Sequence, residues 1–292
     1  MYIECVTVCV NYADFLAHTL PHNKQHFDHM LVITTPEDKE TQNLCTHHNV
    51  EFLTTREMDD GVGGFNKAKG INVGLQYLSK RDWVVHLDAD IYLPPLTRTI
   101  LEKIELDREN IYGMDRMMCP TFEEWVKYIT KPAPTHTGYV YIHPTIFPMG
   151  VRIAEFMNKG YEPIGFFQMW HPNTSDIKLY PDDHSGADRT DVLHAKKWKR
   201  KHRVLIPEII AIHLDSEDAT VKEMGRNWKG RKTKQFGYST EPPVLTEPPG
   251  STSLWKKVLW ISAAGITAVG ITWLVINFET VTSHFPFVTN SP

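Results

Sequence analysis

Short apolar runs rich in β-branched residues alternate with helical periodicity through the first part of this chain. The runs that we predict as strands are Ile3–Val10, Met30–Thr34, Glu51–Thr54, Trp83–Leu87 and Ile111–Met114. Between the third and fourth runs, apolar residues recur at helical spacing, at Ala68, Ile71, Leu75 and Leu78. Strands that alternate with helices favour a mostly parallel sheet covered on both faces, so we expect an α/β fold. In such sheets ligands bind beyond the carboxyl ends of the strands.

The composition excludes some classes of protein. A formal net charge of -4 argues against a dedicated nucleic-acid binder, which usually has a strong basic excess. No two of the four cysteines (Cys5, Cys9, Cys45 and Cys119) form a C-x-x-C pair, so we expect buried thiols in a reducing compartment. The first residues lack a basic stretch that leads into an apolar one, which makes a cleaved secretory signal unexpected.

The C-terminal part of the chain has a different character. Val258–Phe278 is a run of 21 uncharged residues, long enough as a helix to cross about 30 Å of hydrocarbon. We therefore predict a transmembrane helix over 255–278, a Pro-rich linker over 237–254 and a short tail over 279–292, after a catalytic part over 1–236. A buried C-terminal helix of a soluble domain is the alternative. Lys256 and Lys257 precede the apolar run, which predicts that the large domain lies on the cytoplasmic face of the membrane.

Two acidic residues follow the most apolar of the predicted strands. Asp88 and Asp90 come directly after Trp83–Leu87, separated only by Ala89. Carboxylates released together at the end of a buried strand repel each other, and a divalent cation that bridges them to a diphosphate relieves that repulsion. A turn with two solvated aspartates is the alternative interpretation.

A helix start with basic residues precedes this strand. We predict Asn66 as the N-cap, with Lys67 and Lys69 in the first turn, where a helix N-terminus and lysines together suit phosphate oxygens. The preceding segment 61–64 is glycine-rich but lacks the G-K-[S/T] ending of a P-loop. The alternative is that both lysines simply lie on an exposed helix face.

Several segments, taken in order, resemble the GT-A glycosyltransferases of the family-2-like phage and bacterial type, and the likeness covers about residues 3–232. They are the strand before Asp88-Ala89-Asp90, together with Thr7–Tyr12, Asn66–Leu75, Ala211–Leu214 and Asn227–Arg231. The resemblance implies that Mn²⁺ or Mg²⁺ is held by Asp88, Asp90 and His213, with Asp215 as the competitor of His213. It also implies that the donor nucleotide is bound by Asn11, Lys67, Lys69, Asn72, Asp88 and Arg231.

An inverting reaction of this kind needs a base to take the proton of the acceptor hydroxyl. The resemblance places that base at the start of a helix in the stretch 185–192, where Asp191 is the first candidate and Asp188 the second. The family often shows adjacent acidic residues here, whereas this chain has Arg189 and Thr190 between them, which leaves both the base and the inversion open. Helix-capping aspartates are the alternative.

Two further segments allow more than one interpretation. Gly165–Pro172 resembles an acceptor-side strand, on which Gln168 would bond a donor hydroxyl, or else it is core. The basic run Lys196–Arg203 is either a solvated helix end or a surface for anionic lipid heads, a phosphorylated acceptor or modified DNA.

The sequence thus predicts a metal-dependent glycosyltransferase that moves a sugar from a UDP- or GDP-linked donor, inverting if Asp191 or Asp188 is its base. We expect the acceptor, a glycan, a lipid-linked molecule or a modified nucleic acid, at the cytoplasmic membrane face. The alternatives are a membrane-anchored protein that binds a sugar nucleotide without transferring it, and a phage DNA-modifying glycosyltransferase. A sugar-nucleotide pyrophosphorylase is disfavoured, because Asn11–Phe15 stands where such chains carry a Gly-rich phosphate loop.

Overall fold

The computed structural model describes residues 1–59, 65–119, 121–130, 161–172, 179–183 and 190–214. The chain divides into two units, Met1–Tyr238 and Ser239–Pro292, and every described residue lies in the first. The predicted linker and transmembrane helix therefore lie outside the described residues, as do Asp188, Asp215 and Arg231. Within the described ranges, no helix combines the length and the apolar character that a membrane span requires.

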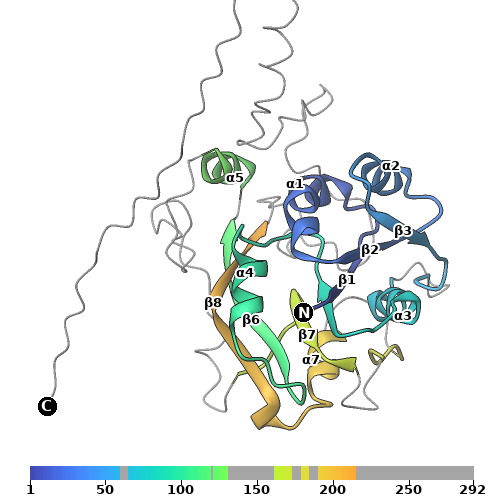
Figure 1. Ribbon diagram of the computed structural model, residues 1–292. Helices are drawn as coiled ribbons and strands as arrows, with labels where there is room; N and C mark the ends of the chain where they lie inside the picture. The colour runs from blue at the N-terminus through green and yellow to red at the C-terminus, as the bar shows by residue number, and fades with distance from the viewer. Residues whose placement is uncertain (60–64, 120, 131–160, 173–178, 184–189, 215–292) are drawn as a thin grey trace, which may run out of the picture. The chain divides into compact units, whose positions relative to one another are not determined.

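The described part is a mixed α/β fold on one eight-stranded sheet (Figure 1). Its strands are β1 (Ile3–Val8), β2 (His29–Thr34), β3 (Glu51–Thr54), β4 (Trp83–Leu87), β5 (Ile91–Tyr92), β6 (Ile111–Cys119), β7 (Phe167–Trp170) and β8 (Arg203–Leu214). The order across the sheet is β3-β2-β1-β4-β7-β6-β8-β5. The predicted α/β class is confirmed.

The direction of the strands follows the prediction only in part. Strands β1 to β4 run parallel to one another, and β6 runs parallel to β8. Strand β7 is antiparallel to both of its neighbours, β4 and β6, and the short β5 is antiparallel to β8. The sheet is therefore mixed, and β7 is the reversed strand that joins its two parallel parts.

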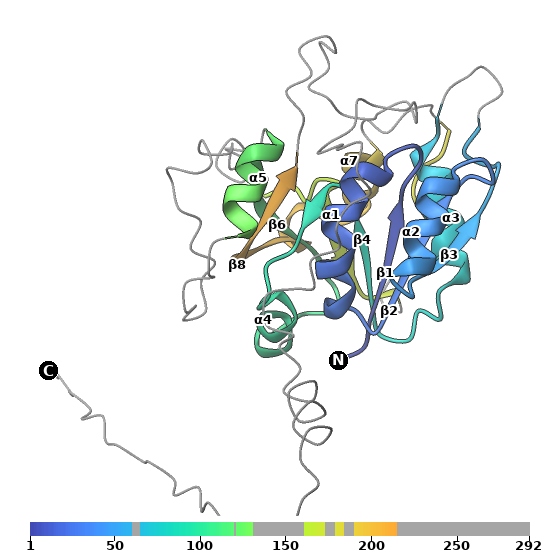
Figure 2. The same ribbon diagram turned by 90° about the horizontal axis from the view of Figure 1, so that it is seen from above.

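Helices cover both faces of the sheet. They are α1 (Ala13–Asn23), α2 (Lys39–His47), α3 (Lys67–Tyr77), α4 (Thr97–Lys103), α5 (Phe122–Ile129) and α7 (Thr190–Ala195), with the 3₁₀ turns η1 (Lys24–His26) and η3 (Arg200–His202). Buried residues of α1, α2, α4 and α5 share one hydrophobic cluster, and those of α3 and α7 share the other. Figure 2 shows this arrangement from above, with α1 and α2 beside β1 and β2. The sheet is thus buried on both sides along its centre.

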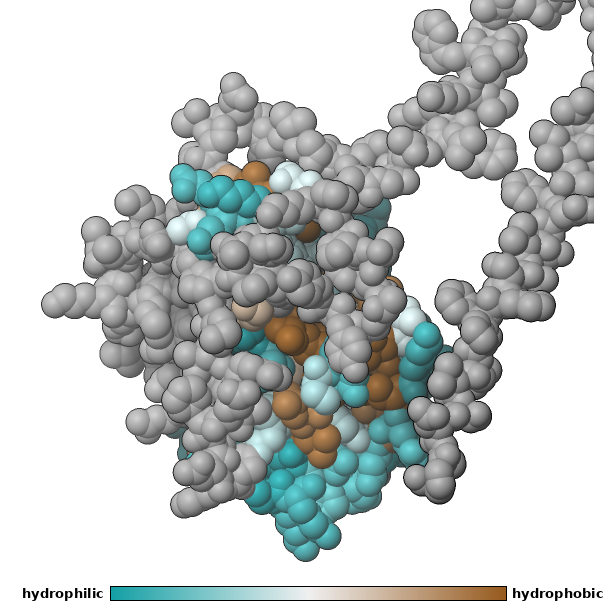
Figure 3. Space-filling view, turned by 90° about the vertical axis from the view of Figure 1, so that its left-hand side faces the viewer, coloured by the Kyte–Doolittle hydropathy of each residue, from teal (hydrophilic) through white to brown (hydrophobic). Residues whose placement is uncertain are grey.

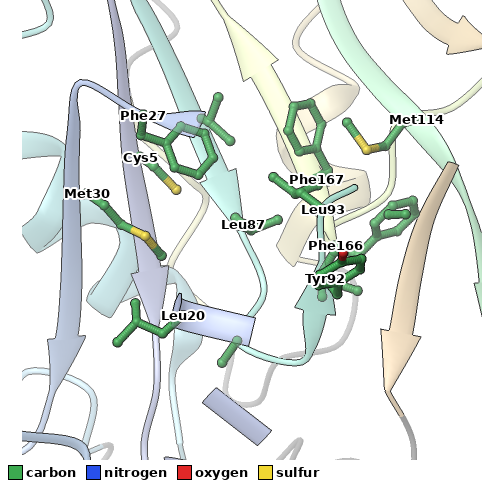
Figure 4. Packing of buried hydrophobic residues seen from close by; sticks show 14 of the residues in the cluster. Cys5, Leu20, Phe27, Met30, Leu87, Tyr92, Leu93, Met114, Phe166 and Phe167 are labelled. Carbon is green, nitrogen blue, oxygen red and sulfur yellow. The ribbon is translucent and has the colours of Figure 1, made fainter. Parts of the chain in front are cut away.

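The first hydrophobic cluster fills the space between α1 and the middle strands. Figure 4 shows Leu20 from α1, Leu87 from β4, Phe167 from β7 and Met114 from β6 among its residues. All four cysteines are free and buried in the described structure, which confirms that they are small core residues and form no disulfide frame.

Helix α3 lies unusually close to β1, because glycines face the strand. A Cβ atom added at Gly74 would lie 2.6 Å from Cγ1 of Val6, closer than carbon atoms pack. The helix begins as predicted, since the side chain of Asn66 accepts a hydrogen bond from the backbone N–H of Lys69 at 3.1 Å. This close packing fixes where the first turn of α3, with Lys67, meets the sheet.

Strand β8 has a bulge in its middle. Met114 of β6 pairs with Ile206, but the next residue, Asp115, pairs with Ile210, so three residues that begin with Pro207 have no counterpart. Proline lacks the N–H that a ladder needs, which suits its place in a bulge, outside the two residues of β8 that pair with β5. Figure 3 faces the side of the molecule on which β8 lies in Figure 1. In the lower half of that view, hydrophobic residues (brown) lie above hydrophilic ones (teal). Beyond the bulge, β8 continues to the strand end that carries His213.

Candidate functional site

The Asp88–Asp90 turn lies where the sheet predicts a ligand site, at the carboxyl end of β4. The backbone N–H of Asp88 donates to the carbonyl oxygen of Phe166 at 3.1 Å, and the N–H of Ile91 donates back to the carbonyl oxygen of Asp88 at 3.3 Å. The turn is therefore tied both to itself and to the segment that leads into β7.

Asp88 is the partner of Lys67. The ammonium group of Lys67, in the first turn of α3, donates to Oδ1 of Asp88, and Nε2 of the buried His86 lies 3.3 Å from the same oxygen. Burial raises the pKa of Asp88, the nearby Asp90 and Asp191 carboxylates raise it further, and Lys67 opposes this rise. Burial also holds the pKa of His86 well below its usual range, so this imidazole is neutral at pH 7. Asp88 is thus a destabilised carboxylate that one lysine balances.

Asp90 has a different set of neighbours. Its Oδ2 accepts a hydrogen bond from the hydroxyl of Tyr12 at 3.1 Å and lies 3.1 Å from Nε2 of His213. The backbone holds the same arrangement, because the N–H of Leu214 donates to the carbonyl oxygen of Asp90 at 2.9 Å and Ile91 pairs with His213 between β5 and β8. The structure thus brings together Asp90 and His213, which lie 123 residues apart in the sequence.

The separation of Asp90 from His213 is that of a hydrogen bond, and it also equals the spacing of two ligand atoms on one divalent cation. Adjacent ligand atoms of an octahedral ion with bonds of about 2.1 Å lie about 3 Å apart, close to the 3.1 Å between Asp90 Oδ2 and His213 Nε2. Among the described residues, no group of three or more His, Cys, Asp or Glu side chains is arranged to hold a metal. For a cation at this position, Asp90 and His213 are the side chains that could hold it, and oxygens of a bound diphosphate would have to supply the other ligands.

Asp191 lies on the other side of the same segment. It is the second residue of α7, where its Oδ2 accepts a hydrogen bond from the backbone N–H of Gly165. Since the carbonyl oxygen of the next residue, Phe166, accepts the backbone N–H of Asp88, two consecutive residues contact the carboxylate of Asp191 and the backbone of Asp88. A Cβ atom at Gly165 would lie 2.5 Å from Cβ of Asp191, so only glycine allows this approach. Asp191 is thus held near the Asp88 turn.

Asn11 and Asn72, both predicted to bind the nucleotide, differ in their exposure to solvent. Asn11 is exposed and adopts a left-handed backbone (φ 54°), with its N–H bonded to Oδ2 of Asp38 at 2.8 Å. Asn72 is buried, and its amide is occupied: it donates to the carbonyl oxygen of Tyr180 at 3.0 Å and accepts the N–H of Tyr180 at 2.7 Å. Asn11 is thus solvent-exposed, whereas Asn72 helps to fasten segment 179–183 to α3.

The interpretation of Gln168 as a residue that bonds a donor hydroxyl is wrong. Its side chain is fully buried in β7, where its amide donates to the carbonyl oxygens of Pro163 at 2.9 Å and Asp191 at 3.0 Å. Its carbonyl oxygen accepts the hydroxyl of Tyr180 at 2.6 Å. Both ends of the amide are satisfied inside the core, which is the alternative that the sequence left open.

Sequence reasoning did not identify two residues that shape the site. One is Tyr12, which contacts Asp90 directly. The other is the buried Asp38, which shapes the loop after β1 by accepting the N–H of Asn11. The side chain of Asp38 also accepts two hydrogen bonds from Thr41, from its N–H at 3.1 Å and from its hydroxyl at 2.7 Å. A usable signal existed for Asp38, because aspartate is a preferred N-cap residue and Asp38 directly precedes α2. No comparable pattern pointed to Tyr12, whose contact is made across 78 residues.

The chain matches no protein-family model, and no curated protein is significantly similar to it. It is similar in part to solved structures. Glucosyl-3-phosphoglycerate synthase from Mycobacterium tuberculosis, in complex with Mn²⁺, UDP-glucose and phosphoglyceric acid, is 13% identical over 40% of this chain and 44% of that chain, with a TM-score of 0.32. Mannosyl-3-phosphoglycerate synthase from Rubrobacter xylanophilus is 19% identical over 40% and 41%, with a TM-score of 0.32. A mycobacterial protein is 11% identical over 74% and 66%, with a TM-score of 0.44.

The chain thus spans less than half the length of the two synthases. Both are named as enzymes that make glycosylated phosphoglycerates, and the first was solved with a metal ion and a nucleotide sugar. Similarities with TM-scores below 0.5 do not by themselves indicate a shared activity, so the function is argued from the site.

Proposed function

We propose that this chain is a metal-dependent glycosyltransferase of the GT-A type that uses a nucleotide-sugar donor. The observation that carries the proposal is the pairing of Asp90 with His213 at the carboxyl end of β4, beside the Lys67–Asp88 ion pair. A two-ligand protein site next to a lysine on a helix N-terminus suits a cation that is chelated by a diphosphate. The order of motifs that resembles GT-A enzymes supports the same conclusion.

Each residue would have a distinct role. Asp90 and His213 would hold Mn²⁺ or Mg²⁺, which neutralises the charge that develops on the leaving diphosphate. Lys67 would move from Asp88 to a phosphate oxygen, since both are anionic partners within reach of the first turn of α3. Asp191 would accept the proton of the acceptor hydroxyl as that hydroxyl attacks the sugar, which makes the reaction inverting.

The donor base, the acceptor and the location in the cell are further parts of the proposal. Asn11, with its exposed left-handed backbone after β1, would meet the base of a UDP- or GDP-sugar. We propose an acceptor near the cytoplasmic face of a membrane, with segment 255–278 as the anchor, on the basis of its uncharged sequence. A reporter fused after Pro292 tests this topology, because a cytoplasmic reporter contradicts it.

Ligand-dependent stabilisation tests the enzymatic proposal. We expect UDP or GDP with Mn²⁺ to raise the melting temperature of the chain, and neither to do so in EDTA. The Asp90→Ala and His213→Ala variants should each lose this effect and Mn²⁺-dependent hydrolysis of donor sugars. A Ser79→Ala variant, altered at the opposite end of the sheet, is the matched control. The proposal is wrong if no nucleotide shifts the melting temperature, or if hydrolysis survives both site variants.

A further inference from the structure

Helix α1 carries an unusual polar stripe on the face that it buries against the sheet. Thr19 and Asn23, four residues apart on this helix, are 0% and 1% exposed, and Tyr12 precedes its first turn. Leu16 and Leu20 on the same face are fully buried apolar residues, as a helix packed on a sheet requires. Polar side chains in such a place cost stability unless they are hydrogen-bonded.

All of their long-range bonds go to one short segment. The hydroxyl of Thr19 donates to the carbonyl oxygen of Ala89 at 2.6 Å. The amide of Asn23 donates to the carbonyl oxygen of Ile91 at 2.6 Å, and its own oxygen accepts the N–H of Leu93 at 2.8 Å. Thr19 and Asn23 therefore satisfy three backbone groups of residues 89–93, a segment that bends sharply and has few ladder bonds of its own.

This segment determines the distance between Asp90 and His213. Asp90 lies between the two residues whose carbonyl oxygens α1 holds, and its own carbonyl oxygen receives the N–H of Leu214 at 2.9 Å. Strand β5, which follows, pairs with β8 at only two residues, one of them His213. Such a short ladder does not hold a register alone, so the three bonds from α1 add a further restraint on the segment.

We infer that Thr19 and Asn23 are positioning residues: they fix residues 89–93 against β8 and so set the separation of Asp90 from His213. The inference rests on the proposed function for its significance, since the separation matters when the pair holds a metal. Residues that orient metal ligands without binding the metal typically matter for affinity, and their removal lowers metal affinity by about 10- to 100-fold. A purely structural role would lower stability without changing this local geometry or the affinity.

The test compares two substitutions of Thr19. Thr19→Val keeps the shape of the side chain but removes its hydroxyl, whereas Thr19→Ser keeps the hydroxyl. Asn23→Asp keeps an acceptor for Leu93 but replaces the donor that faces Ile91. Ser79→Ala is the control, because it deletes a 2.8 Å hydrogen bond to Glu4 at the opposite end of the sheet. Each full-length variant is examined by hydrogen exchange without metal, and then by titration with Mn²⁺ in the presence of UDP.

We expect Thr19→Val and Asn23→Asp to exchange at least about 10-fold faster at Leu93 and Leu214, while β1 and β2 stay protected. Their Mn²⁺ affinity should fall about 10-fold or more, whereas Thr19→Ser and Ser79→Ala should match the wild type in both measurements. Unchanged exchange at Leu214 in both variants overturns the inference, as does a rise that is equal throughout the sheet. A wild-type chain that binds no Mn²⁺ refutes the proposed function instead, and the exchange data still decide whether α1 restrains the turn.

Discussion

Replacement of Asp88 by Asn should make the metal-free chain more stable at neutral pH. Burial is the largest cause that raises the pKa of Asp88, from 3.8 to about 6, and the increase remains although Lys67 opposes it. At about 1.4 kcal/mol per pKa unit, ionised Asp88 costs the folded chain at most about 3 kcal/mol. Since 22% of its side chain is exposed, solvent screening reduces this to between about 1 and 3 kcal/mol. Asparagine keeps the shape and removes the charge.

The pH dependence has a definite sign. The folded pKa lies above the unfolded one, so the folded chain binds more protons between about pH 4 and 6 and becomes less stable as the pH rises through that window. The Asp88→Asn variant lacks this loss. Its advantage should therefore be largest near pH 8 and about half as large near pH 5.

Urea unfolding followed by tryptophan fluorescence at both pH values, in EDTA, measures the difference. The reasoning fails if Asp88→Asn is less stable than the wild type at pH 8 without metal. That result would mean that the ion pair with Lys67 outweighs the cost of burying the carboxylate.

Three other substitutions test the packing around the site. Gly165→Ala should lower the free energy of unfolding, measured in urea, by about 1–3 kcal/mol, because the added Cβ would displace Asp191. The same displacement should reduce donor hydrolysis, and normal hydrolysis would contradict this placement of Asp191. Gly74→Ala, whose Cβ would lie 2.6 Å from a valine of β1, should cost a similar amount, and an unchanged urea midpoint would refute the close packing of α3. Glu162→Gln should lower the free energy of unfolding by about 3–5 kcal/mol, because the buried carboxylate of Glu162 holds Arg203 through two 2.9 Å hydrogen bonds. A loss below about 1 kcal/mol would show that water replaces these bonds.

The features that the sequence predicted correctly are those that local patterns determine. The apolar run predicted at Ile3–Val10 forms a strand over Ile3–Val8, the run Trp83–Leu87 forms β4, and Asn66 caps α3. Strand burial and N-capping depend on residues close in sequence. The expectation of an α/β class followed from their alternation. It needed no knowledge of which strands are neighbours.

What the sequence could not predict depends on contacts over long distances. The reversal of β7 is decided by its two neighbours, β4 and β6, and its apolar pattern reads the same in either direction. The roles of Asn72 and Gln168 depended on Tyr180, which contacts both across the fold. A polar side chain on an apolar face looks the same in sequence whether it meets a ligand or the core.

The separation of Asp90 and His213 by 123 residues has a consequence for how the chain folds. Strands β1 to β4 all lie early in the sequence, whereas the contact between Asp90 and His213 requires β8 to dock beside β6 and β5. Closing so long a loop is slow and entropically costly, so the pair should be among the last features to form. During synthesis a chain that has not yet released residue 214 carries Asp90 without its partner. Ligand binding in a refolding experiment would therefore report completion of the whole sheet.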